Sequence, residues 1–292
     1  MHRPLALLLT SVLLAGCSHL AAPATAALPA ARSAGALSQR VDHVRGIGGL
    51  FFRSANPTAQ YDWYTKHLDL AAKPNEGTWF FWQLPGNAAG FSTMWFIFPA
   101  STTYFNGPCM INYVVDNLDA MLERLKAEGV RVAPKTLSDA GGKFGWAYDA
   151  DGNKIELFEP LIHAAPVPHG HVLGIGGISL KSANQLAQYS WYAEHLGIAA
   201  KPNEGKRFQW ELPGNPPTKL STTWDVYPAT TDHFNGPCMI NYLVDDLQAV
   251  VERLKAEGVQ VDPKAGADAR GKLAWAFDGD GNKFELLEPA GH

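Results

Sequence analysis

The chain has 292 residues, 46% of them hydrophobic, and a net charge of −4, so it is long enough to bury the cores of about two domains. Its 24 lysines and arginines form no basic stripe, which argues against a nucleic-acid partner. Beyond the first residues, no apolar segment is long enough to cross a bilayer as a helix.

The N-terminal segment has the pattern of an export signal. Arg3 precedes an apolar run over Leu5–Leu14, which is too short to span a membrane in a mature protein. The string Leu14 to Cys17 resembles the lipobox of bacterial lipoproteins. The resemblance implies a signal peptide at 1–16, lipid attachment to Cys17, and, from Ser18, sorting to the outer membrane with the protein facing the periplasm. The alternative is an ordinary signal peptide with a chance cysteine.

Residues 17–40 are rich in alanine, proline and serine and lack apolar periodicity. We expect them to form a lipid anchor and flexible tether, so that the lipid is the only contact with the membrane.

From residue 41 onwards the chain contains one domain twice. Ala71–Gly77 recurs unchanged as Ala199–Gly205, and Phe105–Tyr113 recurs unchanged as Phe234–Tyr242. We expect domain 1 at 41–162 and domain 2 at 169–292, so that each residue has a twin in the other repeat. Twins that agree indicate the shared fold, and twins that differ indicate where a site has diverged.

Hydrophobic spacing predicts the same elements in each repeat. In repeat 1 a strand over 47–53 precedes a helix capped by Asn56, and a second helix ends at Gly129. The other expected strands are 79–84, 92–98, 110–115, a short one at 130–132, and a hairpin of 145–148 with 154–158. This order of elements predicts four βαβββ modules in the whole chain.

Three strings carry a family resemblance: Gly46–Gly49 before a strand, Trp63–Leu68 in the first helix, and Asp151–Leu157 near the end of the repeat. All three recur in repeat 2. The region from His43 to Pro289 resembles the vicinal oxygen chelate superfamily, which includes glyoxalase I, extradiol dioxygenases and bleomycin-resistance proteins. The resemblance implies an α+β fold in which four βαβββ modules form two tandem glyoxalase-like domains, with curved mixed sheets around cavities.

The resemblance also implies where a metal ion would bind, usually to histidine on the opening strands and glutamate on the closing strands. Those positions hold Gly49, Met110, a residue near Trp95 and Glu156 in repeat 1, and Gly177, Met239, a residue near Trp224 and Glu285 in repeat 2. One carboxylate cannot replace a shell of three or four ligands. We therefore predict no cofactor. The alternative is a divalent metal held weakly by Glu156 or Glu285, with Asp225 beside the latter, while His43 and His171 are expected at the strand entrances.

The strand face on which the twins differ is expected to line the cavities. In repeat 1 this face is aromatic, which predicts a pocket for an apolar or aromatic ligand formed by Phe51, Trp79, Phe81 and Phe96 and oriented by Arg53, Gln83, Asn112 and Glu156. We expect Arg53 to neutralise the buried Glu156. The alternative is that the rings fill the cavity themselves or bury the contact between the domains.

In repeat 2 the same face is charged. There Lys181 and Arg207 are expected to face Glu211, Asp225 and Glu285, with Asn241 nearby. This set forms either a polar ligand site or a solvated face.

These features favour an envelope-anchored glyoxalase-like protein that binds a small, partly aromatic ligand without the usual metal site. One alternative is a metal-dependent lyase, isomerase or dioxygenase of the glyoxalase type, similar to lactoylglutathione lyase. Another is a structural lipoprotein that docks a partner protein, so whether the chain is an enzyme stays open. The twin residues Cys109 and Cys238 are expected to be buried thiols, with a disulfide as the alternative.

Overall fold

The computed structural model describes residues 44–85, 90–161, 172–213 and 217–290. The predicted signal peptide at 1–16, the lipidation site Cys17 and the tether to residue 40 lie outside these residues, as do His43 and His171. None of the helices within the described ranges combines the length and the apolar character needed to cross a membrane.

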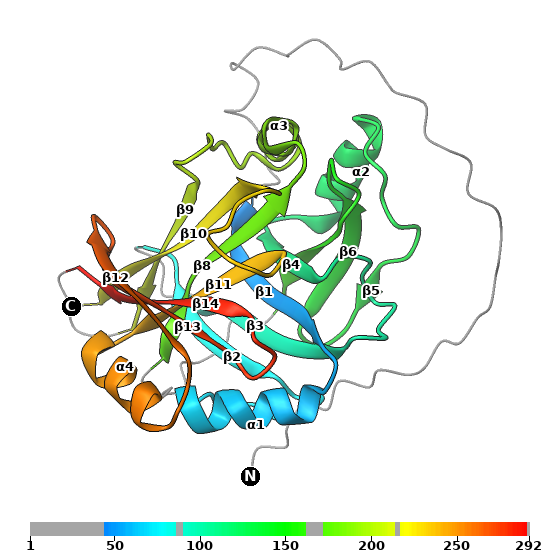
Figure 1. The fold of residues 1–292 in the computed structure, drawn as a ribbon. Coiled ribbons are helices and arrows are strands. Elements are labelled where there is room, and N and C mark those ends of the chain that lie inside the picture. Colours follow the sequence, from blue (N-terminus) through cyan, green and yellow to red (C-terminus); the bar gives the residue numbers. More distant parts are fainter. Residues whose placement is uncertain (1–43, 86–89, 162–171, 214–216, 291–292) are drawn as a thin grey trace. The chain divides into compact units, whose positions relative to one another are not determined.

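Each repeat contains two helices and a series of strands (Figure 1). Repeat 1 comprises β1 (Val44–Ser54), α1 (Pro57–Leu68), β2 (Thr78–Gln83), β3 (Gly90–Pro99), β4 (Cys109–Val115), α2 (Leu118–Ala127), β5 (Leu137–Ser138), β6 (Gly142–Tyr148) and β7 (Lys154–Pro160). Repeat 2 comprises β8 (Val172–Ser182), α3 (Gln185–Leu196), β9 (Lys206–Leu212), β10 (Thr218–Pro228), β11 (Cys238–Val244), α4 (Leu247–Ala256), β12 (Val261–Asp268), β13 (Gly271–Phe277) and β14 (Lys283–Pro289).

Local sequence signals account for the helix boundaries. The side chain of Asn56 accepts a hydrogen bond from the backbone N–H of Ala59, and Pro57 occupies the first turn of α1, as predicted. The twin helix α3 is capped in the same way by Asn184. Each of these two helices ends in a residue with left-handed backbone, Asp69 after α1 and Gly197 after α3.

The strands form one mixed sheet of 14 strands in the order β12-β13-β14-β11-β8-β10-β9-β2-β3-β1-β4-β7-β6-β5. In each repeat the first strand pairs in parallel with the third, as β1 does with β3, whereas neighbouring hairpin strands are antiparallel. The two repeats meet at the sheet centre, where the described residues include the register pair of Gln83 and Glu211.

Two details of the predicted module pattern are wrong. The strand expected at 130–132 is reduced to a single bridge between Val132 and Ala147, and the short strand of that module is β5 instead. Among the described residues the first module of each repeat reads βαββ, and the second module reads βαβββ.

Buried side chains gather on both sides of the sheet. On the helix side, Trp95 of β3 and Tyr113 of β4 join residues of α1 and α2 in the main core. On the other side, Phe51 of β1, Phe96 of β3 and Trp146 of β6 form a separate cluster with Phe105 and Met110. Strands β1 and β6 are separated in the sheet by β4 and β7, so the sheet must curve to bring these side chains together. We call this inner side the concave face.

The two repeats share one helix-side core within the compact unit Val41–His292. Figure 1 shows α1 of repeat 1 beside α4 of repeat 2, and α3 of repeat 2 beside α2 of repeat 1. Tyr64 of α1 donates a hydrogen bond to Asp278 Oδ2 at 3.1 Å, and its twin Tyr192 donates to Asp149 Oδ2 at 3.4 Å. Each repeat therefore supplies a helix to the core of the other.

Pairs of a histidine and a glutamate close the same two interfaces. His67 Nδ1 lies 2.5 Å from Glu257 at the end of α4, and its twin His195 Nδ1 lies 2.7 Å from Glu128 at the end of α2. The carboxylate partner of each histidine thus lies in the opposite repeat.

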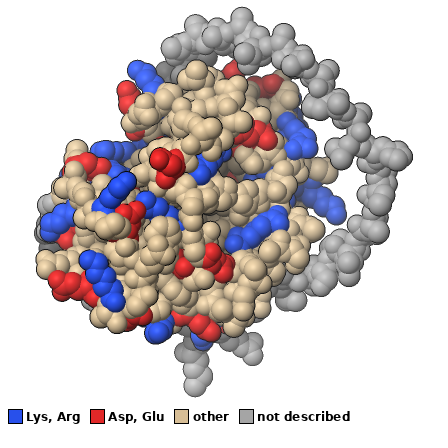
Figure 2. All heavy atoms as spheres, viewed as in Figure 1, with Lys and Arg blue, Asp and Glu red and all other residues tan. Residues whose placement is uncertain are grey.

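The exposed charges on the face in view are mixed. Figure 2 shows lysine and arginine side chains interspersed with aspartate and glutamate over this face. No stripe of a single sign crosses it, as the sequence pattern also indicates.

We expect Tyr64→Ala to lower the free energy of unfolding of both repeats together by about 3 to 5 kcal/mol, the range for emptying a large buried aromatic site. The ring packs against Trp95 of its own repeat and Tyr242 of the other, so its loss weakens the shared core. Urea unfolding followed by circular dichroism measures the effect. Lys66→Ala, an exposed position on the same helix, should change stability by less than about 0.5 kcal/mol. Two separate transitions, with one unchanged by Tyr64→Ala, would contradict the shared core.

Candidate functional site

A buried glutamate lies at the centre of the concave face of repeat 1. Glu156 on β7 is 2% exposed and accepts hydrogen bonds from Asn112 Nδ2 at 2.6 Å, Trp146 Nε1 at 2.7 Å and Tyr104 Oη at 2.5 Å. Asn112 and Trp146 lie directly opposite Glu156 on the neighbouring strands β4 and β6. Burial raises the pKa of Glu156, and the three hydrogen bonds oppose that rise because they favour the carboxylate.

Aromatic rings fill the rest of this face. Phe51 and Phe96 are buried, and both pack against Phe98 at ring-centroid distances of 5.9 and 4.7 Å. Phe98 in turn stacks on Tyr104 at 5.4 Å. The rings that were expected to line a pocket are therefore in contact with one another, which favours the alternative in which they fill the cavity.

The other residues predicted to line this pocket lie elsewhere. Trp79 and Phe81 are on β2, outside the aromatic cluster, and Trp79 is 37% exposed. Gln83 lies opposite Glu211 where β2 meets β9. The divergent face of β2 therefore belongs to the junction of the repeats, away from Glu156.

The expectation that Arg53 neutralises Glu156 is wrong. Arg53 donates from Nη1 to the carbonyl oxygen of Ala100 at 2.9 Å and from Nη2 to the carbonyl oxygen of Phe105, and its guanidinium lies over the Phe105 ring. The cation beside the carboxylate is Lys154, whose Nζ lies 4.8 Å from the centre of the Trp146 ring and helps to hold the pKa of Glu156 down.

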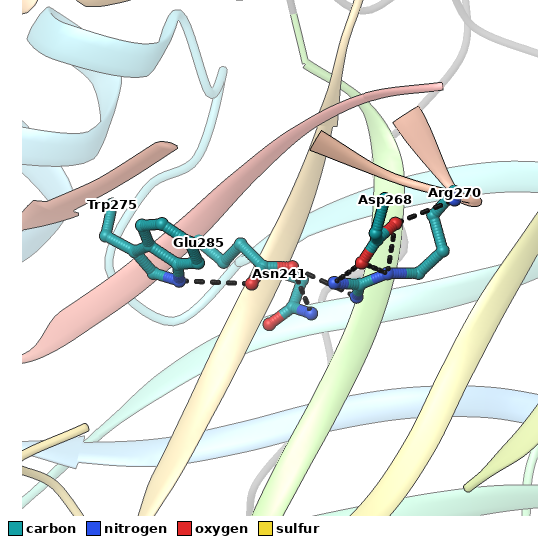
Figure 3. Close-up of polar contacts among 5 residues, drawn as sticks. All are labelled: Asn241, Asp268, Arg270, Trp275 and Glu285. Carbon is teal, nitrogen blue, oxygen red and sulfur yellow. Dashed lines mark hydrogen bonds and ion pairs between the residues drawn. The ribbon is translucent and has the colours of Figure 1, made fainter. Parts of the chain in front are cut away.

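Repeat 2 contains the twin glutamate in a different environment (Figure 3). Glu285 on β14 is 2% exposed and accepts hydrogen bonds from Asn241 Nδ2 at 2.9 Å and Trp275 Nε1 at 3.0 Å. Its third partner is Arg270 Nη1 at 3.2 Å, and the same guanidinium bonds Asp268 Oδ2 through Nε at 2.9 Å and Nη2 at 2.8 Å. Burial raises the pKa of Glu285, and Arg270 and Trp275 oppose the rise.

A second carboxyl faces the same site. Asp225 on β10 lies opposite Ser179 on β8, and these two residues replace the twins Phe96 and Phe51 of repeat 1. Burial raises the pKa of Asp225 to about 6, although a hydrogen bond with Ser179 and the charge of Arg270 oppose it. Its Oδ1 is buried and has no hydrogen-bond partner among the described residues. Repeat 2 thus exchanges two filling rings for a hydroxyl and an incompletely satisfied carboxyl.

An aromatic wall completes the second site. Tyr227 stacks on His233 at a ring-centroid distance of 5.3 Å, and His233 meets Trp275 edge to face at 5.9 Å. The arrangement matches that of Phe98, Tyr104 and Trp146 in repeat 1. Because His233 replaces Tyr104, the phenol that bonds the glutamate in repeat 1 is missing here. Burial, with the nearby Lys283 and Arg270, lowers the pKa of His233, so the neutral imidazole is favoured at neutral pH.

Three more predicted residues occupy the surroundings of this second site. Lys181 Nζ donates to the carbonyl oxygen of Phe234 at 2.7 Å and lies over that ring, as its twin Arg53 does with Phe105. Arg207 is exposed on β9 and Glu211 is buried at the β2–β9 junction. Burial raises the pKa of Asp268, but hydrogen bonds from Arg270 and the charges of Arg270 and Arg207 outweigh burial and lower the pKa. Arg207 is therefore close enough to Asp268 to lie at the edge of the site.

The comparison with known families agrees with this geometry. The sequence model of the Glyoxalase/Bleomycin resistance protein/Dioxygenase superfamily matches residues 40–157 and 183–286, which together exceed half of the chain. The chain belongs to this superfamily. The predicted α+β fold with two tandem glyoxalase-like domains is thereby confirmed. No curated protein matches the chain in sequence.

Solved structures of the superfamily share the fold at low sequence identity. The Mn(II)-bound glyoxalase from Novosphingobium aromaticivorans is 16% identical with a TM-score of 0.56, covering 85% of this chain and 83% of that one. The 2,3-dioxygenase LapB from Pseudomonas sp. KL28 is also 16% identical with a TM-score of 0.56, covering 85% and 93%. The 2,2',3-trihydroxybiphenyl 1,2-dioxygenase from Sphingomonas wittichii strain RW1 is 15% identical with a TM-score of 0.56, covering 84% and 90%.

The residues of this superfamily member at the expected ligand positions do not fit a divalent metal. A Cβ at Gly49 would lie 2.9 Å from Phe51 Cζ, and one at Gly177 would lie 2.8 Å from Asn241 Nδ2, so an imidazole at either position would require the neighbouring side chain to move. Met110 and Met239 fill the other two opening positions with buried thioethers. Within the described part of the chain, no three His, Cys, Asp or Glu side chains gather as a metal site would require.

The closing-strand positions agree with this conclusion. They fall on Phe96 and Asp225, one residue after the helix-side rings of Trp95 and Trp224. Glu156 and Glu285, the weak metal candidates, are already bonded to three donor groups each. A metal at Glu285 would have to compete with Arg270.

Sequence reasoning missed several residues of both sites. Trp146 and Trp275 lie opposite the glutamates across the predicted hairpins, so the pairing of each tryptophan with its glutamate could have been predicted. The difference between Gly141 and its twin Arg270 was also visible as a divergence of the repeats. The loop residues Tyr104 and His233 carried no local signal, because only the fold brings them to the glutamates.

We expect Asp225→Asn to stabilise the protein at pH 8 and to have a smaller effect at pH 4.5. The folded-state pKa of Asp225 is about 6, above the usual 3.8, so its contribution favours folding at low pH and is lost as the pH rises through 6. The difference between the two pH values should be on the order of 1 to 3 kcal/mol. Urea unfolding at both pH values measures it, with the exposed Asp232→Asn as the matched control. A variant that is relatively less stable at pH 8 would contradict the assignment.

Proposed function

We propose that the chain is an envelope-anchored member of the superfamily that binds a small, partly aromatic molecule on the concave face of repeat 2 without a metal ion. The observation that carries this proposal is the buried Asp225 Oδ1, which has no hydrogen-bond partner within the part of the chain that the structure describes. A buried carboxylate oxygen without a donor costs free energy, so a ligand O–H or N–H group placed there gains a charge-assisted hydrogen bond.

The surroundings of Asp225 support a ligand with a ring. Tyr227, His233 and Trp275 present aromatic surfaces beside the two carboxyls, and such walls with a few polar anchors are typical of small-molecule sites. Arg270 and Asp268 at the β12–β13 turn border the site, and Asn241 holds Glu285 in place. The ligand class that matches is a planar ring with at least one hydrogen-bond donor.

The packing of repeat 1 also supports a binding site in repeat 2 alone. Its glutamate has three neutral donors from Tyr104, Asn112 and Trp146, and its rings occupy the face that a ligand would need. We therefore assign the binding role first expected for Phe51 and Phe96 to the twin site, and a structural role to repeat 1.

The names of related structures suggest the first probe. Two structures that share the fold are named as a catechol dioxygenase and as a 2,2',3-trihydroxybiphenyl 1,2-dioxygenase. A catechol has a ring and two adjacent O–H donors, which is the chemistry that Asp225 and the aromatic wall would accept. The proposal for this chain is binding, because its residues at the expected metal positions do not fit a metal.

We expect saturable catechol binding in isothermal titration calorimetry, and we expect Asp225→Asn to weaken it about tenfold or more, because the charge-assisted hydrogen bond is lost. The double change Ser179→Phe and Asp225→Phe, which restores the residues of repeat 1, should abolish binding. Lys255→Ala, an exposed change on α4, is the matched control and should bind like the parent. Elemental analysis should find far less than one metal ion per chain. Stoichiometric manganese, iron, nickel or zinc, or catechol binding that survives the double change, would contradict the proposal.

The envelope location rests on the sequence from Arg3 to Ser18 alone. We expect bacteria that express the chain to incorporate labelled palmitate into it, and we expect Cys17→Ser to abolish the label and release the protein from the outer-membrane fraction. Gel fluorography of fractionated cells measures both. A label that persists in the Cys17→Ser chain would contradict lipid attachment at this position.

A further inference from the structure

The twin residues Cys109 and Cys238 lie at the same place in the molecule. Cys109 begins β4 and Cys238 begins β11, each directly after a proline, and the two positions are far apart in the sequence. The structure holds both as free thiols that are partly exposed. Equivalent positions of a duplicated chain meet only where the axis that relates the repeats passes between them.

Two clefts lined by residues of both repeats show that the starts of β4 and β11 are neighbours. One cleft, of about 90 Å³, is lined by Cys109 together with Leu180, the register partner of Cys238. The other, of about 200 Å³, is lined by Cys238 together with Phe52, the register partner of Cys109. Pro108 and Pro237 line both clefts.

The Cys238 thiol also affects that of Cys109. Interaction with Cys238, burial and the charge of Asp149 raise the pKa of the Cys109 thiol. The neutral thiol of Cys109 therefore predominates at neutral pH, which slows its reaction with an oxidant and favours a test at higher pH. The clefts on either side give a small reagent access to both sulfur atoms.

We propose that Cys109 and Cys238 form a reversible disulfide that links the two repeats covalently. The bond goes beyond the proposed ligand site and does not depend on it. It would tie the starts of β4 and β11, the strands that carry Asn112 and Asn241 and thereby hold the two buried glutamates.

The oxidant is a low-molecular-weight disulfide such as oxidised glutathione. One cysteine thiolate attacks a sulfur of glutathione disulfide, which forms a mixed disulfide and releases one glutathione thiolate. The second cysteine thiolate then attacks the protein sulfur of the mixed disulfide and releases the second glutathione. The two cysteines lose two protons and two electrons in all, and glutathione disulfide is reduced to two thiols.

The disulfide should stabilise the folded chain. It closes a long loop and so restricts the unfolded ensemble, and it fastens the interface at which each repeat completes the core of the other. Because the pair lies on the helix side of β4, the bond leaves the concave face of each repeat unchanged. We therefore expect a higher thermal midpoint with unaltered catechol binding.

The test oxidises the full chain under native conditions with glutathione disulfide at pH 8.5, alkylates the remaining thiols and maps the peptides without reduction. We expect most monomeric molecules to contain the peptide of Cys109 joined to that of Cys238, a thermal midpoint that rises on oxidation, and full reversal by dithiothreitol. The Cys17→Ser chain, the matched control, should behave identically. Cys109→Ser and Cys238→Ser should lose both the joined peptide and the thermal shift.

Three results would overturn the proposal. Both cysteines could stay reduced, and therefore be alkylated, under conditions that oxidise the urea-unfolded chain. Alternatively, they could form mixed disulfides with glutathione without forming the bond between them. The joined peptide could also appear only in dimers. The parent chain alone decides among these results, so the test stands even if a serine variant fails to fold.

Discussion

A carboxylate that is buried inside a curved sheet requires hydrogen-bond donors, and this requirement determines the structure of both repeats. A lone ionised group in a low-dielectric interior is strongly disfavoured, so Glu156 and Glu285 are stable only because the neighbouring strands present an asparagine and a tryptophan at matching register. These donors lie on β4 and β6, or on β11 and β13, so the carboxylate on β7 or β14 also fixes how these three strands of each repeat align. The concave face is therefore built around a polar centre that the surrounding rings protect from water.

The two repeats differ in the third hydrogen-bond donor that they supply to the glutamate. In repeat 1 the third donor is the phenol of Tyr104, and packed rings close the face. In repeat 2 the third partner is the guanidinium of Arg270, which is shared with Asp268 from a turn, and the phenol is replaced by the imidazole of His233. With Ser179 and Asp225 in place of two phenylalanines, the second face is polar and contains an unmatched acceptor. One copy thus fills its concave face with packed rings, while the other keeps a polar face.

The fold follows from the sequence to a large extent, and the sites do so only in part. Asn56 and Pro57 set the start of α1, and the turn at Asp151 and Gly152 sets the hairpin that carries Glu156, because both signals act within a few residues. The direction of Arg53 could not be predicted, since two carbonyl oxygens on a distant loop determine it. The contribution of Arg270 and the pairing of β2 with β9 likewise depend on segments that only the complete sheet brings together.

The exchange of helices between the repeats has a consequence for how such a chain arises. Tyr64 and Tyr192, Asp278 and Asp149, and His67 and His195 are identical twins that make the same contacts in opposite directions. A half-length ancestor would meet its own duplicate through this surface and form a symmetric homodimer. Gene fusion then needs only a connecting segment and no new interface. Once the halves share one polypeptide, mutations no longer fall on both subunits at once, so one half can lose an ancestral group while the other retains it.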